Sequence, residues 1–526
     1  MAMLMLLFFL IIGALSVRNQ SVTYDEPYHY QYGHNVLTGN STRFDDSKMP
    51  FSALNALPAI VSKALPSGAL KDKLSALYPA RLMTLLFSIL AGWIVFHWSS
   101  KLYGPVPGLI SLTLYILDPN IIAHSQLVTT DIYISGMVLF CAYWLWKYAS
   151  THKTSDGVIF ALMLGLAQLA KYTAVSLYAL LPIALLVNEQ AQLRVALSQG
   201  LGSIWRETRR YLLYAIIVVA ISILVINLGF LFNRSFTNLR DYDLKSSLFQ
   251  AIQAKINIPI PTPYPYLEGF DWISAKESTN LGFIYIYLFG NTRFGQGFPG
   301  YYLVASLLKV PLTTQIIIIT ALVVYFSDRQ RRKSFLKNEW FLLWLVFFYT
   351  IYFNFFYKSQ IGIRYYLVVF PLLYVFAGNL FTNWSKFTRT QAITCLALGI
   401  FLLGSVFSKY PNYLSYFNEL IGNQKTAYKY LADSNLEWGQ DTHLLEQFRK
   451  DHPRAKKAPE TPGLITENAT YYVSINRLVG AINGPENYRW LRENFEPVDL
   501  LGNSFLIYKI KPAEIRKLCE TSTYCK

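Results

Sequence analysis

The sequence predicts a polytopic α-helical membrane protein that ends in a small α+β domain. Of its 526 residues, 53% are hydrophobic and only 15% are charged, a composition typical of chains that lie mostly within a bilayer. Apolar runs recur up to residue 408, whereas residues 409–526 are more charged and polar. We therefore expect a transmembrane domain over residues 1–408 and a separate domain over residues 409–526.

The apolar runs predict about eleven transmembrane helices, several of them shorter than the ~20 residues that a bilayer requires. The first run, residues 3–17, lies where a signal peptide would, but no basic segment precedes it and no small-residue cleavage site follows it. We therefore interpret it as a retained helix. The other predicted spans are residues 77–98, 104–117, 131–149, 157–170, 172–188, 211–232, 300–326, 339–357, 365–383 and 390–408.

The basic residues predict the orientation of the chain in the membrane. With the N-terminus inside, the inner stretches hold most of the basic residues near the spans, whereas the short outer turns hold Lys171, Lys358 and Arg364. The positive-inside rule favours this orientation. The same distribution accounts for the net charge of +16, so we do not expect nucleic acid as a partner. Long outer segments then cover residues 18–76, 233–299 and 409–526.

The three outer segments differ in character. Residues 18–76 open on an acidic motif and include a weakly amphipathic run, residues 53–60, that suits a helix in the membrane interface. Residues 233–299 contain Pro261-Thr262-Pro263-Tyr264-Pro265, which we interpret as too proline-rich for a helix, so a long irregular loop is expected. Strands are predicted at residues 471–475 and 505–508. Cys519 and Cys525 near the C-terminus form a disulfide or remain free thiols.

Ionisable residues that are distant in the sequence are expected to meet at the outer face. Carboxylates at a membrane boundary indicate a functional site. Asp25 and Glu26 follow the first span, and Asp131 opens the fourth. The basic residues expected on the same side are Arg81, Lys171, Lys309, Lys358 and Arg364.

This mixture of charges suits a particular kind of reaction. A carboxylate can take the proton of a hydroxyl or amine while Arg and Lys stabilise the oxygens of a departing phosphate. The sequence has no Gly-rich phosphate loop typical of a soluble nucleotide donor. A donor carried by a lipid would explain a site at the bilayer surface.

Several short motifs, through their order and spacing, resemble a known family. They are Asp25-Glu26, Lys48-Met49-Pro50, Ala80-Arg81-Leu82, Val128-Thr129-Thr130-Asp131, Gly165–Thr173, Gly362-Ile363-Arg364-Tyr365-Tyr366, Pro411–Glu419 and Asp433–Asp441. With them the chain resembles, nearly end to end, the GT-C superfamily glycosyltransferases of the protein O-mannosyltransferase and aminoarabinose-transferase type (glycosyltransferase family 39-like). The last two motifs are most similar to those of bacterial members.

The resemblance implies an inverting hexosyl- or pentosyltransferase that moves a sugar from a polyprenyl phosphate to an acceptor protein, lipid or envelope glycan. It makes Asp25 the catalytic carboxylate, with Glu26 beside it, and Asp131 a second acidic position. Arg81, Lys171, Lys309, Lys358 and Arg364 are candidate ligands of the donor phosphate. Candidate contacts to the acceptor or sugar are Tyr28, His29, Lys48, Trp438 and Asp441.

The resemblance leaves other points open. Some members bind a divalent metal and others need none, so a metal cofactor stays undecided. Met49 replaces the first of two prolines that many relatives carry after a His or Lys. A bacterial inner membrane is expected, with the site and the C-terminal domain on the periplasmic side.

The candidate residues also have structural alternatives. Asp25 and Asp131 suit helix N-caps, and Lys171 and Arg364 can snorkel to the interface. Arg81 can pair with Asp25 or Glu26. His29 is expected to face solvent or the acceptor rather than a metal, and Trp438 to stack on a sugar or to pack the C-terminal domain. The alternative function, a secondary transporter or flippase of lipid-linked sugar, predicts internal repeats and mid-span charges that the sequence does not clearly show.

Overall fold

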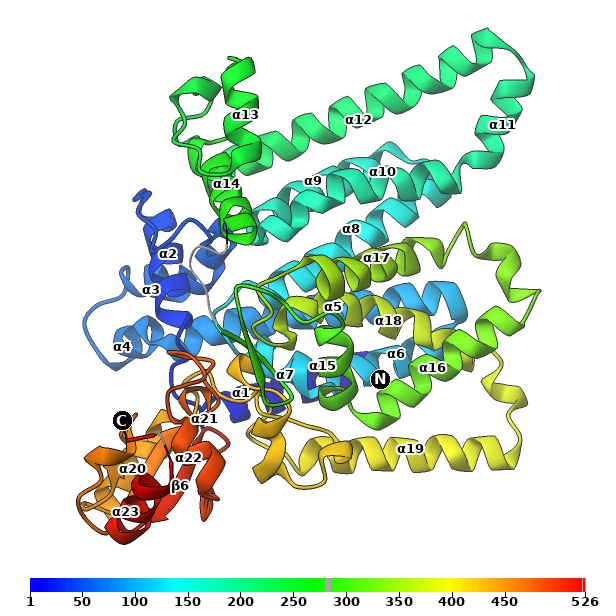
Figure 1. Ribbon diagram of the computed structural model, residues 1–526. Helices are drawn as coiled ribbons and strands as arrows, with labels where there is room; N and C mark the ends of the chain where they lie inside the picture. Colours follow the sequence, from blue (N-terminus) through cyan, green and yellow to red (C-terminus); the bar gives the residue numbers. More distant parts are fainter. Residues whose placement is uncertain (280–284, 523, 526) are drawn as a thin grey trace.

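The computed structural model describes residues 1–279, 285–522 and 524–525. A bundle of long helices carries a small mixed domain at one end (Figure 1). We call this end the outer end, after the predicted orientation. The bundle helices are α1 (Ala2–Val17), α5 (Leu77–Tyr103), α6 (Pro105–Ile116), α7 (Pro119–Ser125), α8 (Asp131–Thr151), α9 (Thr154–Ala170), α10 (Leu177–Asn188), α11 (Gln190–Ser198), α12 (Leu201–Gly229), α15 (Tyr301–Lys309), α16 (Leu312–Ser327), α17 (Trp340–Ile351), α18 (Phe370–Ala377) and α19 (Arg389–Phe407).

These helices confirm the predicted polytopic α-helical fold. Within the described residues, α5, α12, α19 and the helical stretch Ile363–Phe381 are each long and apolar enough to cross a membrane. Counting each of 3 bent helix pairs as one span raises the number from 4 to 7. Shorter apolar helices, among them α1 and α9, occupy further predicted spans. Helix α8, whose N-terminus carries Asp131, is buried along most of its length and packs against α5 and α9.

The predicted span at residues 300–326 is not one straight helix. It divides into α15 and α16, whose axes meet at an angle of 118°. Pro311 causes the break, because its ring keeps the preceding residue out of the helical conformation. Val310 is accordingly extended, with φ −90° and ψ 136°. Lys309, the last residue of α15, is therefore held at the bend and is buried.

Residues 18–76 and 233–299 cover the outer end with more helix than the sequence predicted. The first segment forms α2 (Glu26–Leu37), α3 (Ala53–Ser62) and α4 (Ala69–Ser75), and α3 is the helix expected over residues 53–60. The second segment was predicted to be an irregular loop, which is wrong. It contains α13 (Ser247–Lys255), α14 (Tyr264–Thr279) and the antiparallel hairpin of β1 (Tyr285–Leu288) and β2 (Asn291–Phe294). Pro265 is the second residue of α14, where its missing N–H has no partner to lose.

A close approach between backbones fixes α2 at the outer end. Gly33 of α2 lies so near the turn before α3 that a Cβ on Gly33 would fall 2.1 Å from the carbonyl oxygen of Ser52. Only glycine fits there without moving the helix. Since Asp25 immediately precedes α2, this contact helps to fix the position of its carboxylate.

The chain after α19 ends in the predicted small α+β domain. Its sheet has the order β3-β4-β6-β5 and pairs Tyr471 with Tyr508 and Val473 with Leu506. The strand predicted at residues 505–508 falls within β6, and the one predicted at residues 471–475 overlaps β4 except for Ile475, which begins α21. A disulfide joins Cys519 to Cys525. The elements are α20 (Thr442–Asp451), β3 (Lys456–Lys457), β4 (Ala469–Ser474), α21 (Ile475–Leu478), α22 (Arg489–Asn494), β5 (Asp499–Leu501), β6 (Phe505–Ile510) and α23 (Pro512–Thr521).

Candidate active site

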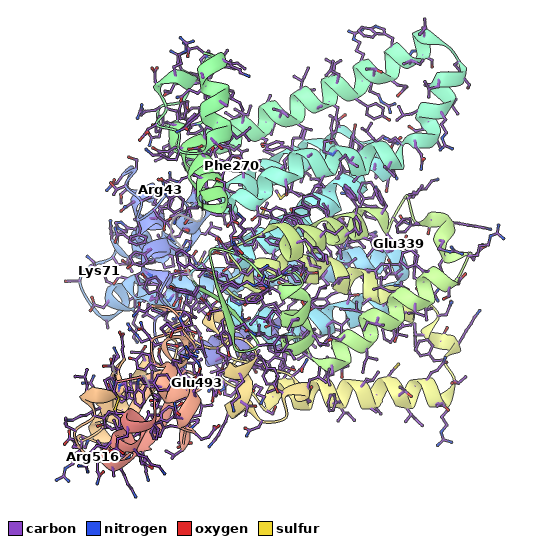
Figure 2. The ribbon with its side chains drawn as sticks, viewed as in Figure 1. Arg43, Lys71, Phe270, Glu339, Glu493 and Arg516 are labelled. Atoms are coloured by element: carbon purple, nitrogen blue, oxygen red, sulfur yellow. A yellow bond between two sulfur atoms is a disulfide. The ribbon has the colours of Figure 1, made fainter. Side chains whose placement is uncertain are left out.

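A cavity of about 340 Å³ lies at the outer end, where α2, α8 and α14 meet the chain just before α18. Figure 2 shows one of its wall residues, Phe270 of α14, at this end, and Glu339 toward the opposite end of the bundle. The lining residues are Asp25, His29, Ser47, Lys48, Thr130, Asp131, Lys171, Tyr172, Thr173, Phe270, Ile273, Ser274, Glu277, Tyr352, Tyr357, Arg364 and Tyr365.

Two carboxylates and two cations from four distant parts of the chain form one network in this wall. Arg364 Nη1 lies 2.8 Å from Asp25 Oδ2 and 3.8 Å from Asp131 Oδ2. Lys171 Nζ lies 2.6 Å from the other oxygen of Asp131, at Oδ1. The predicted convergence of Asp25, Asp131, Lys171 and Arg364 at one site is therefore present in the structure.

The two carboxylates differ in solvent exposure and in the number of oxygens that face a cation. The Asp131 side chain is 3% exposed and both of its oxygens face cations, whereas the Asp25 side chain is 22% exposed. Burial alone would raise the pKa of the Asp25 carboxyl, but the guanidinium of Arg364 and the ammonium of Lys48 hold that pKa below its usual value of 3.8. Asp25 is thus ionised at neutral pH and is the more accessible acid.

The acidic and basic side chains of the cavity wall are equal in number. Burial and the nearby Lys48 lower the pKa of His29 to about 3, so the ring is neutral at pH 7. The acids on the wall are Asp25, Asp131 and Glu277, and the bases are Lys48, Lys171 and Arg364. An incoming anion must therefore compete with the carboxylates for these cations.

Glu26 and Arg81 form a separate, fully buried pair. Arg81 Nε and Nη2 donate to the two carboxylate oxygens of Glu26 at 2.7 and 2.5 Å. Glu26 Oε1 also accepts from the backbone N–H of Val128 at 3.0 Å, and Glu26 is 0% exposed. The structural alternative for Arg81, a pair with a neighbouring carboxylate, is confirmed for Glu26. Through Glu26, the start of α2 is bound to Arg81 of α5 and to the residues before α8, and neither member of the pair lines the cavity.

Other predicted site residues lie away from the cavity wall. Lys309 Nζ donates to the carbonyl oxygens of Leu414 and Asn435, and the Tyr28 ring stacks on Phe44. The backbone N–H of Lys358 donates to Glu277, but Lys358 does not line the cavity.

The two predicted site residues of the C-terminal region have different surroundings. Asp441 accepts hydrogen bonds from Asn503 and Ser504, inside the C-terminal domain. The Trp438 ring lies 4.0 Å from the guanidinium carbon of Arg364, so it contacts the network directly.

Sequence reasoning missed some of the wall. Glu277 accepts from the Lys358 N–H at 3.1 Å and from the Ser359 hydroxyl, and it lies in a segment expected to be a loop, without a motif. Tyr365 follows Arg364 within the Gly362–Tyr366 motif, and its ring lies 3.9 Å from Lys171 Nζ. Among the described residues, no group of three or more His, Cys, Asp or Glu side chains is arranged to hold a metal ion.

The fold and the cavity together define a multi-pass membrane protein with a charged site at one end of its helix bundle. Residues 74–226, which include Arg81, Asp131 and Lys171, match the family model described as dolichyl-phosphate-mannose-protein mannosyltransferase. Over these residues the match confirms the resemblance to glycosyltransferases of the protein O-mannosyltransferase type. No curated protein sequence matches the chain.

Solved structures of two proteins are similar to this chain. One is ArnT from Cupriavidus metallidurans bound to undecaprenyl phosphate, with 12% identity, a TM-score of 0.48 and coverage of 75% of this chain and 62% of that chain. The other is the oligosaccharyltransferase AglB from Archaeoglobus fulgidus with an inhibitory peptide and a dolichol-phosphate, with 13% identity, a TM-score of 0.47 and coverage of 84% and 59%. The chain thus matches about three fifths of the length of each.

Proposed function

We propose that this protein is an inverting glycosyltransferase that moves a hexosyl or pentosyl group from a polyprenyl phosphate to an acceptor at the outer face of the membrane. The observation that carries the proposal is the network of Asp25, Arg364, Asp131 and Lys171 in one cavity wall, with Asp25 the accessible carboxylate. The family match over residues 74–226 supports the same reaction class.

Asp25 acts as the general base in this proposal. The acceptor hydroxyl or amine attacks the anomeric carbon from the face opposite the phosphate, and its proton passes to the Asp25 carboxylate. The bond between the anomeric carbon and the phosphate oxygen breaks, and the polyprenyl phosphate leaves with the bonding electrons. Because one displacement occurs, the anomeric configuration inverts.

Arg364 and Lys171 stabilise the phosphate. Both are cations on the cavity wall, and a guanidinium can donate two parallel hydrogen bonds to phosphate oxygens. Without the donor they are held by carboxylates, so the donor must draw Arg364 partly away from Asp25. That exchange makes Asp25 a stronger base only when the donor is bound.

The proposal also includes the location and the acceptor of the reaction. We place the chain in a bacterial inner membrane with the cavity and the C-terminal domain on the periplasmic side. The acceptor is a protein, a lipid or an envelope glycan. A transporter or flippase of lipid-linked sugar, the alternative function, is not favoured by the family match.

The proposal is tested by sugar transfer in membranes that contain the protein or lack it. We expect transfer from one member of a panel of radiolabelled polyprenyl-phosphate sugars, with release of polyprenyl phosphate in equal amount. NMR of the product should show the anomeric configuration opposite to that of the donor. Retention of configuration, or no transfer across the panel while labelled lipid crosses the bilayer, would contradict the proposal.

The pH dependence provides a second prediction. The ionisable groups around Asp25 are Arg364, His29 and Lys48, with Asp131 across Arg364. Since Arg364 lowers the pKa of Asp25, kcat/KM for the donor should stay constant on the acid side until the pH falls below about 3.8, the usual aspartate value. Donor binding withdraws Arg364, so the acid limb of kcat should lie at higher pH.

Both profiles come from initial rates over a range of pH, with each sample also assayed after return to neutral pH to exclude unfolding. An acid limb of kcat at or below that of kcat/KM would show that the donor does not compete for Arg364.

A further inference from the structure

A short segment at the start of the C-terminal region contacts the chain on both sides of the Asp25–Arg364 pair. We call residues 433–441 the clamp segment. On the Asp25 side, the backbone N–H of Tyr24 donates to the carbonyl of Trp438 at 3.0 Å, and that of Ser21 donates to the carbonyl of Gln440 at 2.8 Å. These bonds fix the chain immediately before Asp25.

On the Arg364 side, the clamp segment uses side chains. The backbone N–H of Ile363 donates to Asn435 Oδ1 at 3.0 Å, and the Ser434 hydroxyl donates to the carbonyl of Ile361. The Trp438 ring lies over the guanidinium of Arg364, 4.0 Å from its centroid to Cζ. A cation over the face of an indole is attracted by the ring quadrupole, and burial strengthens the attraction.

Two glycines allow these close approaches. Gly439 has φ +96°, and a Cβ on it would lie 3.2 Å from the carbonyl oxygen of Val22. Gly362 has φ +104°, and a Cβ on it would lie 2.3 Å from the Ser434 hydroxyl. At both positions the backbone has a positive φ and a Cβ would crowd a neighbouring oxygen atom. The packing of the clamp segment against the stretches before Asp25 and before Arg364 therefore depends on glycine.

Lys309 holds the clamp segment from the bundle side. Its buried ammonium donates to the carbonyl oxygens of Asn435, at 2.5 Å, and Leu414, at 2.9 Å. Asn435 is therefore bound through its carbonyl by Lys309 and through its side chain to Ile363, the residue before Arg364. Asn435 thus links Lys309, at the bend before Pro311, to the residue that precedes Arg364 of the cavity wall.

We infer that the clamp segment is part of the catalytic apparatus and that Trp438 is a positioning residue, which holds the guanidinium of Arg364 against Asp25. The kinetic consequences of this inference rest on the proposed glycosyl transfer. The energetic coupling between Trp438 and Arg364 does not depend on which reaction the protein catalyses. It assigns to the C-terminal region a role in arranging the active site. It also gives Lys309 a positioning role in place of direct contact with the donor.

The kinetic test compares Trp438→Leu and Trp438→Phe with Trp490→Leu. Trp490 is also a buried tryptophan of the C-terminal domain, and its indole N–H donates to the Glu460 carbonyl. Trp438→Leu should lower kcat/KM by roughly tenfold or more, the size of effect expected for a desolvated cation–π contact. Trp438→Phe, which keeps a ring, should lose less, and Trp490→Leu should keep the wild-type kinetics in the fraction that folds.

The pH profile separates positioning from simple loss of packing. If Arg364 is no longer held on Asp25, the acid limb of kcat/KM should move to higher pH in Trp438→Leu but not in Trp490→Leu. An unchanged acid limb in Trp438→Leu, or the same shift in both variants, would overturn the inference.

A second measurement needs no substrate and so does not depend on the proposed function. Thermal unfolding of Trp438→Leu, Arg364→Gln and the double variant gives a double-mutant cycle in purified protein. We expect the Tm decrease of the double variant to be smaller than the sum of the two single decreases. Additive decreases would refute the contact between Trp438 and Arg364, whether or not the protein transfers sugar.

Discussion

Replacing Asp25 with asparagine is expected to lower the rate of sugar transfer by about 10²- to 10⁴-fold, the usual contribution of a general base. Asparagine has nearly the same shape, and its Oδ1 can still accept the hydrogen bond from Arg364 that Asp25 Oδ2 accepts at 2.8 Å. The fold should therefore persist while the proton acceptor is lost. Asp131 is a poor substitute because it is 3% exposed and both of its oxygens face cations.

The measurement is transfer from the radiolabelled lipid donor in membranes with matched amounts of each variant. Asp46→Asn is a matched control, because Asp46 is also an outer aspartate paired with a buried arginine, Arg43, at 3.3 Å, yet it does not line the cavity. We expect the control to transfer sugar at nearly the wild-type rate. Full activity of Asp25→Asn would instead make Asp25 structural and direct attention to Asp131.

Much of the site was predictable because the signals were local. An acidic motif directly after one apolar run, and an aspartate at the start of another, predict that Asp25 and Asp131 lie on the same side of the membrane. The orientation that the positive-inside rule favours places the turns with Lys171 and Arg364 on that side as well. These four residues form the network in the cavity wall.

Pairing among these residues was not predictable from the sequence. Asp25 and Glu26 are adjacent, yet Asp25, just before α2, lines the cavity, whereas Glu26, the first residue of α2, points into the protein toward Arg81. Their roles depend on the rotation of one helix, which contacts with Ser52 and Val128 decide. Similarly, Lys309 precedes a Val-Pro break, and the direction of its side chain depends on the 118° bend.

The proline-rich stretch before α14 shows a different limit. Proline disfavours a helix interior, and residues 261–265 hold three prolines, so a loop was expected. The last proline falls in the first turn of α14, where it is tolerated, and the helix then brings Phe270 and Glu277 to the cavity. Glu277 was missed because nothing near it in the sequence forms a motif.

The second large effect is expected for Arg364→Gln, which should lower kcat/KM by roughly 10²- to 10³-fold, as when one donor to a developing anion is removed. The donor KM should rise and binding of a polyprenyl phosphate alone should weaken, because a cation proposed to face the phosphate is lost. Without the guanidinium, burial raises the pKa of Asp25, so the acid limb of kcat/KM should move to higher pH. Arg364→Lys should recover part of the binding, since it keeps the charge but loses the planar fork.

A control for this variant must remove an arginine–carboxylate pair without touching the cavity. Arg331 pairs with Asp328 at 3.2 Å between α16 and α17, and Arg331→Gln should leave the affinity for a polyprenyl phosphate unchanged. Titration of that lipid into purified protein separates the two roles of Arg364. If Arg364→Gln binds the lipid as tightly as wild type but transfers sugar slowly, Arg364 acts only on Asp25, and the phosphate must be held by Lys171 and Lys48, the other cations on the wall.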